Sequence, residues 1–285
     1  MDTAPSSAPR APLSVTGASA VPSSQWGRVT LVGAGPGDAE LLTLKAARVL
    51  ASARVVLYDN LVSKDVLQHV PADAELIYVG KKTSNHTLPQ EGIIELMVRL
   101  AQAGRSLVRL KGGDPYIFGR GGEEAQALAA AGIACDTIPG ISAAQGAAAA
   151  TGIPLTHRDH AGMLVLATGH LQGEGEERTV DLDWDALARP RQTVVIYMGV
   201  GTLAVICKQL IAHGLAPDTP AALIERATWP GQRNVFGTLQ NLPALSLAHQ
   251  VSSPAIIMIG HTVALHASIG SAVNLASEAP LTHPT

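Results

Sequence analysis

The residues best suited to chemistry gather in one glycine-rich segment, VRLKGGDPYIFGRGG at residues 108–122. An apolar run that ends at Leu110 predicts a short buried strand, and Gly112 and Gly113 follow it at once. Because neither glycine carries a Cβ atom, the backbone can turn sharply there and come close to a ligand. A strand followed by a glycine loop and a helix start is typical of ligand sites in open α/β sheets. We therefore expect a ligand at this loop; the alternative is a long glycine-rich turn that binds nothing.

Three ionisable side chains could move a proton near such a ligand. Asp59 and Lys81 each follow an apolar run, so both are expected at the loop end of the sheet. Glu123 is a rival base, one turn beyond Arg120 on the same face of the next predicted helix. General acid–base catalysis needs such groups within hydrogen-bonding reach of the reacting atoms. The residue types do not rank the three, and a helix-capping Asp59 and a solvated Lys81 are the non-catalytic alternatives.

A second glycine motif, GAGPGD at residues 33–38, is similar to a dinucleotide-binding loop. Asp59 stands where a ribose-binding acid would follow the second strand. Two details count against an NAD(P)-dependent oxidoreductase. The third glycine comes one position early, and Pro36 removes an amide that would donate to the pyrophosphate. The oxidoreductase is therefore the weaker alternative.

The histidines and cysteines do not form a metal-binding pattern. His157 and His160 lie in a loop-like segment without a third ligand in sequence, so we expect no metal. Cys135 and Cys207 are far apart, and each lies in an apolar run, which favours buried free thiols. Two cysteines exclude a disulfide scaffold, and a reducing cytoplasm is the expected location.

The composition is that of a chain with a large aliphatic core. Of the 285 residues, 47% are hydrophobic but only 3% are aromatic, so the core must consist mainly of Ala, Val, Leu and Ile. A net charge of −3 argues against general nucleic-acid binding, and an anionic substrate would need a local cationic site. No run of 18 apolar residues occurs and the N-terminus lacks a signal-peptide pattern, so no membrane segment is expected.

Strands and helices alternate along most of the chain, which predicts largely parallel sheets flanked by helices. Residues 152–161 interrupt the alternation and favour a linker between two α/β domains. The predicted organisation is a disordered tail (1–27), a first α/β domain (28–151), the linker (152–161), a second α/β domain (162–270) and a tail (271–285). The expected strands are residues 28–32, 54–58, 75–79, 106–110, 134–138, 163–168, 193–197, 221–224 and 255–259. The expected helices are residues 40–53, a helix to 103 opened by a capping box of Thr87 and Gln90, a helix from about 123 to 132, 142–150 and 202–213.

Several separate motifs resemble the tetrapyrrole methylase superfamily, and within it the uroporphyrinogen-III C-methyltransferases. The resemblance runs from about residue 28 to about residue 265 with the motifs in the family's order, which makes it specific. The motifs are VTLVGAGPGDAELLTLKA (29–46), YDNLVS (58–63), VGKK (79–82), KGGDPYIFGRGGEE (111–124), PGISAA (139–144), GIPLTHRD (152–159) and YMG (197–199).

The resemblance implies an active site in a cleft between the two domains, where S-adenosylmethionine binds in a folded conformation. Backbone groups and small residues would allow a close approach to the adenosine, and Asp114 would balance positive charge or accept from a hydroxyl. For Met198 and Ala227 the alternative is plain core packing, and Ala227 stands where many relatives carry glycine. The implied contacts are Pro36, Gly112, Gly113, Asp114, Ile117, Ser142, Ala143, Met198 and Ala227.

The resemblance also implies a substrate made of pyrrole rings that carry carboxylates. Arg120 and Arg158 fall on the implied substrate-binding positions, and a guanidinium can hold a carboxylate through two parallel hydrogen bonds. Asp59 and Lys81 match the implied proton acceptor and donor. Surface salt bridging is the alternative for the two arginines.

The implied activity is methyl transfer from S-adenosylmethionine to two ring carbons of uroporphyrinogen III, through precorrin-1 to precorrin-2, on the routes to sirohaem, cobalamin or haem d1. The resemblance further implies a homodimer that needs no metal, and together with the charge and the apolar pattern it leaves no nucleic-acid or membrane partner expected. No dehydrogenase or ferrochelatase domain is evident, so a monofunctional enzyme is expected. A non-catalytic tetrapyrrole-binding protein is the remaining alternative; it explains the arginines but not the cofactor-type residues.

Overall fold

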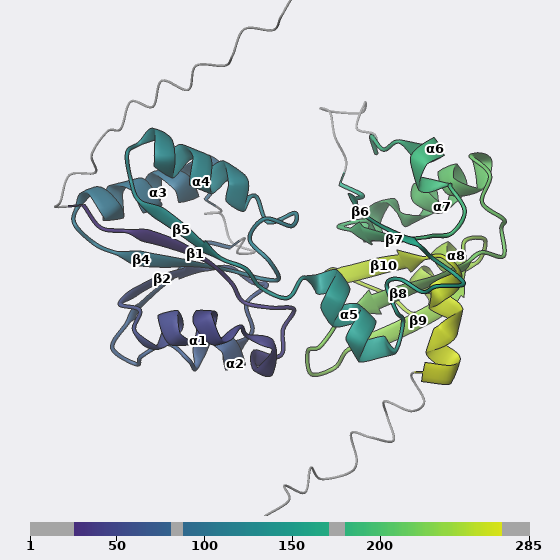
Figure 1. Ribbon diagram of the computed structural model, residues 1–285, viewed down its shortest axis with the longest axis horizontal. Coiled ribbons are helices and arrows are strands. Elements are labelled where there is room, and N and C mark those ends of the chain that lie inside the picture. The colour runs from purple at the N-terminus through teal and green to yellow at the C-terminus, as the bar shows by residue number, and fades with distance from the viewer. Residues whose placement is uncertain (1–25, 81–87, 171–179, 270–285) are drawn as a thin grey trace, which may run out of the picture.

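The computed structural model describes residues 26–80, 88–170 and 180–269. Two five-stranded sheets lie side by side along the long axis of the molecule, each with helices packed on it (Figure 1). The prediction of two α/β units is thereby confirmed. Within these described ranges, no helix is long and apolar enough to cross a membrane.

The first sheet has the strand order β3-β2-β4-β1-β5, and all its pairs are parallel. Parallel neighbours need crossover connections, which the intervening helices provide. Strand β4 lies between β2 and β1, and all of its residues are buried. The strands are β1 (Val29–Gly33), β2 (Val55–Tyr58), β3 (Glu75–Tyr78), β4 (Leu107–Lys111) and β5 (Cys135–Ile138), close to the predicted ranges.

Helices cover both faces of the first sheet, and alternation along β4 decides which side chains meet them. The helices are α1 (Leu44–Ala51), α2 (Lys64–Leu67), α3 (Gln90–Gln102) and α4 (Gly121–Ala130). Val108 and Leu110 pack with α1 and α2, whereas Leu107 packs with α3 and α4. Arg109 and Lys111 share the face of Leu107 because they alternate with it. Two cations of the central strand therefore face α3 and α4.

The second sheet has the strand order β6-β7-β10-β8-β9 and corrects the prediction of a largely parallel arrangement. β6 and β7 are parallel, but β10 is antiparallel to both β7 and β8, and β8 is antiparallel to β9. Residues 226–232 between β8 and β9 are too few for the crossover that a parallel connection needs. β9 was itself not predicted. The strands are β6 (Met163–Thr168), β7 (Gln192–Tyr197), β8 (Pro220–Glu225), β9 (Arg233–Thr238) and β10 (Ala255–Ile259).

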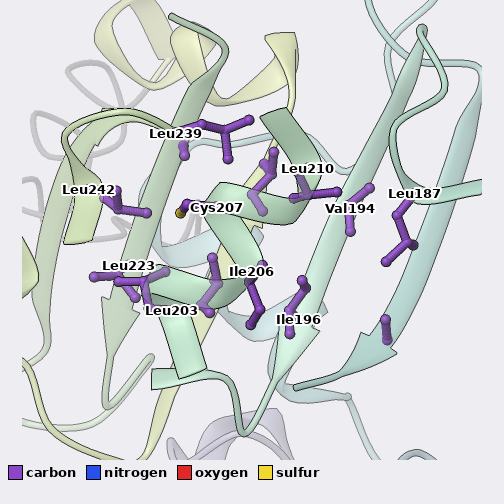
Figure 2. Close-up of a cluster of buried hydrophobic side chains, with 14 of the residues drawn as sticks. Leu187, Val194, Ile196, Leu203, Ile206, Cys207, Leu210, Leu223, Leu239 and Leu242 are labelled. Atoms are coloured by element: carbon purple, nitrogen blue, oxygen red, sulfur yellow. The ribbon is translucent and has the colours of Figure 1, made fainter. Parts of the chain in front are cut away.

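The two faces of the second sheet are covered by different parts of the chain. On one face, Ile206 and Leu210 of α7 pack against Ile196 of β7 and Leu223 of β8 (Figure 2). On the other face, Ala147 of α5 joins a cluster with side chains of β7, β8 and β10. The predicted first domain, 28–151, therefore includes a helix that packs on the second sheet. The domain boundaries given above remain predictions. The helices are α5 (Ala143–Thr151), α6 (Trp184–Leu187), α7 (Leu203–Ala212) and α8 (Leu242–Ala248), of which α6 and α8 were not predicted.

The predicted helix over residues 40–53 is two separate elements. A 3-10 turn covers Ala39–Leu41, and α1 begins only at Leu44. Thr43 Oγ1 accepts a hydrogen bond from the backbone N–H of Ala46 at 3.1 Å, so Thr43 caps a new helix instead of continuing the turn. The first glycine loop is consequently not followed directly by an α-helix.

A capping box is present, but at α5. Ser142 Oγ accepts from the backbone N–H of Gln145 at 3.3 Å, and Gln145 Oε1 accepts from the backbone N–H of Ser142 at 3.0 Å. Of the pair predicted to cap α3, Thr87 lies outside the described residues. Gln90 directs its amide at Glu124, with 2.9 Å between Gln90 Nε2 and Glu124 Oε1.

Both cysteines are free, as predicted, but only Cys207 is fully buried, whereas Cys135 is partly exposed. Burial raises the pKa of the Cys135 thiol to about 11 and that of the Cys207 thiol to about 12. Neither is a thiolate near neutral pH, so neither has the ionised sulfur that a cysteine nucleophile requires.

Three glycine-containing loops cross at the carboxyl ends of β1, β4 and β5. The Gly35 N–H donates to Gly113 O at 3.2 Å, and the Gly113 N–H donates to Gly35 O at 2.7 Å. A Cβ atom on Gly140 would lie 2.3 Å from Gly113 O, and one on Gly33 would lie 2.5 Å from Gly140 N. The three loops can therefore meet only if these positions lack side chains.

Gly140→Ala tests this crossing. Because the added methyl would meet backbone that cannot rotate away, we expect the free energy of unfolding to fall by about 1–3 kcal/mol, the usual cost of overpacking. Gly122→Ala is the control, since its Cβ meets nothing within 4 Å and it lies in α4. That substitution should raise the free energy of unfolding by about 0.5–1 kcal/mol. Urea unfolding of the wild type and both variants measures these changes. A Gly140→Ala midpoint equal to that of the wild type would show that the crossing is not tight.

Candidate functional site

A cavity of about 1000 Å³ lies at the carboxyl ends of the first sheet's strands and is closed by residues of the second unit. Its wall contains backbone of the glycine loops, apolar side chains and several charged groups. Most of the predicted site residues line it, although they come from segments far apart in sequence. These are Pro36, Asp59, Gly112, Gly113, Asp114, Ile117, Arg120, Ser142, Ala143, Met198 and Ala227.

Two predicted site residues that the structure describes, Glu123 and Arg158, do not line this wall, and a third cannot be placed. Lys81 lies outside the described residues. Glu123 is about half exposed and is held by Arg120, with 2.8 Å between Arg120 Nε and Glu123 Oε1, and this hydrogen bond lowers the pKa of the Glu123 carboxyl. Arg158 is exposed, and its carbonyl accepts a hydrogen bond from Arg191 Nη2 at 2.9 Å. The geometry thus brings Arg120 to the cavity but not Glu123 or Arg158.

Asp114 ties two of the loops together. Its Oδ1 accepts from the Tyr116 N–H at 2.8 Å, and its Oδ2 accepts from the Gly140 N–H at 3.0 Å. Both carboxylate oxygens are thereby oriented by backbone, and each keeps capacity for a further donor. The carboxylate is a fixed negative charge in the cavity wall beside Gly113.

The most buried charges of the site were not singled out from the sequence. Arg109, Lys111 and Glu124 are at most 4% exposed. Glu124 Oε1 accepts from Lys111 Nζ at 2.9 Å, from Gln90 Nε2 at 2.9 Å and from Arg109 Nε at 3.4 Å. Arg109 and Lys111 line the cavity, and Glu124 of α4 lies behind them. We call Arg109, Lys111, Glu124 and Asp59 the buried ion cluster.

Asp59 joins this cluster through Arg109. The distance between Arg109 Nη2 and Asp59 Oδ2 is 3.0 Å, and Asp59 Oδ1 accepts from the Leu61 N–H at 3.0 Å. The Asp59 side chain is 20% exposed and lines the cavity, so it is the cluster's accessible carboxylate. Two cations balance two anions, which offsets the large cost of burying them; breaking such a pair commonly costs about 3–5 kcal/mol.

The surroundings lower the pKa of the Lys111 ammonium group below its usual value. Burial and the neighbouring Arg109 lower the pKa of its ammonium group, whereas Glu124 and Asp59 oppose that change. The two carboxylates therefore favour the charged form of Lys111 in the cavity wall.

One sequence signal could have revealed this cluster. In the buried strand LVRLK, the cations occupy alternate positions, so both face the same helices. Buried charges need partners, and the first turn of the next helix carries Glu123 and Glu124. The sequence does not show which of the two glutamates turns inward, because that depends on how α4 docks.

Backbone strain also gathers around the cavity. Phe118, Arg120, Met198 and Arg226 line it and have positive φ angles between 50° and 57°. Non-glycine residues adopt this conformation at a cost, and such residues cluster at functional sites. Two of them lie in the central glycine loop and two follow β7 and β8, so both halves hold strained backbone at the cavity.

Direct hydrogen bonds join the two α/β units at the cavity edge. Trp229 Nε1 donates to Pro36 O at 2.9 Å, and the Asp38 N–H donates to Thr228 Oγ1 at 3.1 Å. The first glycine loop is therefore in contact with the second unit. A dinucleotide site would instead need this loop to open directly into a helix whose N-terminus receives the pyrophosphate. Here α1 begins at Leu44, after an intervening 3-10 turn.

The described part of the chain contains no group of three or more His, Cys, Asp or Glu side chains arranged to hold a metal ion. What the cavity offers is close backbone, fixed carboxylates and buried cations. Such a wall suits a cationic, partly apolar cosubstrate beside an anionic substrate, and Asp59 can accept a proton.

Comparisons with known proteins agree with the sequence motifs. The family model described as Tetrapyrrole (Corrin/Porphyrin) Methylases matches residues 28–243. A siroheme synthase of Thioalkalivibrio sulfidiphilus is 53% identical over 240 residues, which cover 84% of this chain and 48% of that protein. The chain thus spans about half the length of the curated relatives it matches.

The solved structures match over nearly their whole length. The native uroporphyrin III C-methyl transferase of Thermus thermophilus is 42% identical, with a TM-score of 0.70, over 83% of this chain and 93% of that chain. The same enzyme complexed with S-adenyl homocysteine matches with the same values. The predicted resemblance is therefore confirmed, and the chain belongs to the tetrapyrrole (corrin/porphyrin) methylase family.

Proposed function

We propose that this chain is an S-adenosylmethionine-dependent C-methyltransferase that methylates uroporphyrinogen III twice, through precorrin-1, to give precorrin-2. One observation carries the proposal: the residues expected to contact the cosubstrate meet in one cavity with Asp59 and buried cations. The similar Thermus enzyme was crystallised with S-adenyl homocysteine. The roles assigned to individual residues below are parts of this proposal.

In the proposed reaction, an electron-rich pyrrole carbon attacks the sulfonium methyl group in line. A carbon–carbon bond forms, the carbon–sulfur bond breaks, and S-adenosylhomocysteine leaves. A proton must then leave the pyrrole system, and Asp59 is the proposed acceptor because it is the accessible carboxylate of the buried ion cluster. The sulfonium is already a good leaving group, so the protein contributes mainly position and proton transfer.

Two groups of residues in the cavity wall have different proposed roles. The cosubstrate would be held by Pro36, residues 112–114, Ile117 and residues 142–143, together with Met198 and Ala227 of the second unit. Arg120 would bind a substrate carboxylate. Lys81 as proton donor and Arg158 as a second substrate contact stay predictions.

The two other candidate functions fit less well. An oxidoreductase lacks support because the glycine loop after β1 does not lead into a helix N-terminus. A non-catalytic tetrapyrrole-binding protein would not need a second set of contacts formed by glycine loops and small residues.

One prediction of this proposal concerns cosubstrate identity. Calorimetry should detect S-adenosylhomocysteine binding and no NADH binding, because the cavity supplies close backbone and no pyrophosphate-binding helix start. The two titrations use the same preparation. NADH binding without S-adenosylhomocysteine binding would contradict the methyltransferase.

Arg120→Lys tests the proposed substrate contact. Lysine keeps the charge but loses the planar fork, so kcat/KM for uroporphyrinogen III should fall at least about tenfold, or about 1.4 kcal/mol. S-adenosylhomocysteine affinity should be retained. The control is Arg54→Lys, since Arg54 is exposed and paired with Asp73 away from the cavity. An equal loss of cosubstrate affinity in Arg120→Lys would assign Arg120 to the cosubstrate side or to the fold.

Asp59→Asn tests the proposed base. Asparagine keeps the size and one acceptor oxygen but is not basic, so turnover should fall at least about a hundredfold. S-adenosylhomocysteine affinity should stay within about threefold, which is less than about 0.7 kcal/mol. Methyl transfer and binding are measured on one preparation whose fold is checked by circular dichroism. Near-normal turnover would remove Asp59 as the base.

A further inference from the structure

Glu124 has no direct place in the proposed reaction, yet it is the most buried charge of the buried ion cluster. Its exposure is 0%, and it lies behind the cavity wall and not in it. Three donors converge on its Oε1, from β4 and α3, while Oε2 has no hydrogen-bond partner among the described residues. A carboxylate with one unpaired oxygen costs more free energy to bury than a carboxylate whose two oxygens both accept hydrogen bonds.

The contacts of Glu124 lead to Asp59 through one side chain. Arg109 directs Nε to Glu124 and Nη2 to Asp59, and its Nη1 donates to Leu110 O at 2.9 Å. All three guanidinium nitrogens are engaged, so the planar group has one orientation. That orientation also sets the position of the Asp59 carboxylate, whose other oxygen accepts from the Leu61 N–H.

We propose that Glu124 is a positioning residue, whose buried carboxylate holds Arg109 and thereby fixes Asp59 in the orientation that accepts the proton. This inference rests on the proposed function, in which Asp59 is the base. Glu124 itself does not line the cavity, so it acts through Arg109.

The charges around Lys111 strengthen the argument. Its ammonium faces Arg109 on its own strand, Glu124 on α4 and Asp59 after β2. Without the charge of Glu124, Arg109 and Lys111 would repel each other across the same face of β4, with Asp59 as their remaining counter-ion. Both cations would then compete for Asp59, and its carboxylate would no longer have one defined cationic partner.

The test is a double-mutant cycle with Glu124→Gln and Asp59→Asn. Glu124→Gln should lower turnover at least about tenfold, because a small misplacement of a reacting group is costly. S-adenosylhomocysteine affinity should stay within about threefold. The double variant should lie within about threefold of Asp59→Asn alone, since a group that acts through Asp59 cannot matter once the base is gone.

Glu225→Gln is the matched control. Glu225 is likewise buried, is paired with Arg233 and accepts from Ser252 Oγ at 2.9 Å, but it does not line the cavity. It should lose stability with turnover within about threefold of the wild type. Glu124→Asp should recover part of the turnover, and if Glu124→Gln does not fold, the same cycle is run with Glu124→Asp.

The outcomes distinguish a failure of this inference from a failure of the proposed function. If turnover losses multiply in the double variant, Glu124 does not act through Asp59 and the inference is wrong, while the proposed function stands. Near-wild-type turnover in Glu124→Gln overturns it as well. If Asp59→Asn alone turns over normally, both the proposed base and the inference fail.

Discussion

The structure depends on the close crossing of three loops at Gly33, Gly113 and Gly140. The backbones of these loops come so near that a single Cβ atom on Gly140 would lie 2.3 Å from a carbonyl oxygen. Asp114 fixes the crossing by accepting from the Gly140 N–H, and the Gly35–Gly113 pair of hydrogen bonds closes it. The crossing places bare backbone on one side of the cavity. It also brings Pro36 to Trp229, so the packing of loops in one half determines where the other half meets it.

Another part of the cavity wall depends on buried charge. Arg109 and Lys111 alternate with apolar residues along the central strand, so one face of the strand is wholly apolar and the other carries the two cations of the buried ion cluster beside Leu107. Charges in such a position are stable only as a paired set. The set leaves Asp59 as its accessible carboxylate and so joins fold stability to the chemistry proposed for the cavity. Relatives of known structure share the overall fold. Substitutions in this chain can test whether glycine-loop backbone and buried charges form the cavity wall in this way.

Local signals in the sequence were enough to predict most strands and the glycine loops. The run before Gly112, for example, has a strand's composition, and the resemblance to tetrapyrrole methylases identified residues that now line one cavity. Strand direction could not be predicted in the second unit, because an apolar run such as residues 255–259 is equally compatible with either direction. The alanine-rich α5 could not be assigned to a sheet, since its own small apolar residues mark no distinct apolar face. The burial and pairing of Glu124 were missed because its partners lie on β4 and α3, and only the docking of α4 distinguishes it from Glu123.

The most direct test of the account is the product itself. The purified chain is incubated anaerobically with S-adenosylmethionine and uroporphyrinogen III, and the tetrapyrrole is analysed by mass spectrometry. The account predicts a product heavier by two methyl groups, each replacing one hydrogen, together with S-adenosylhomocysteine. Recovery of uroporphyrinogen III with unchanged mass, from folded protein that binds S-adenosylhomocysteine, would contradict it.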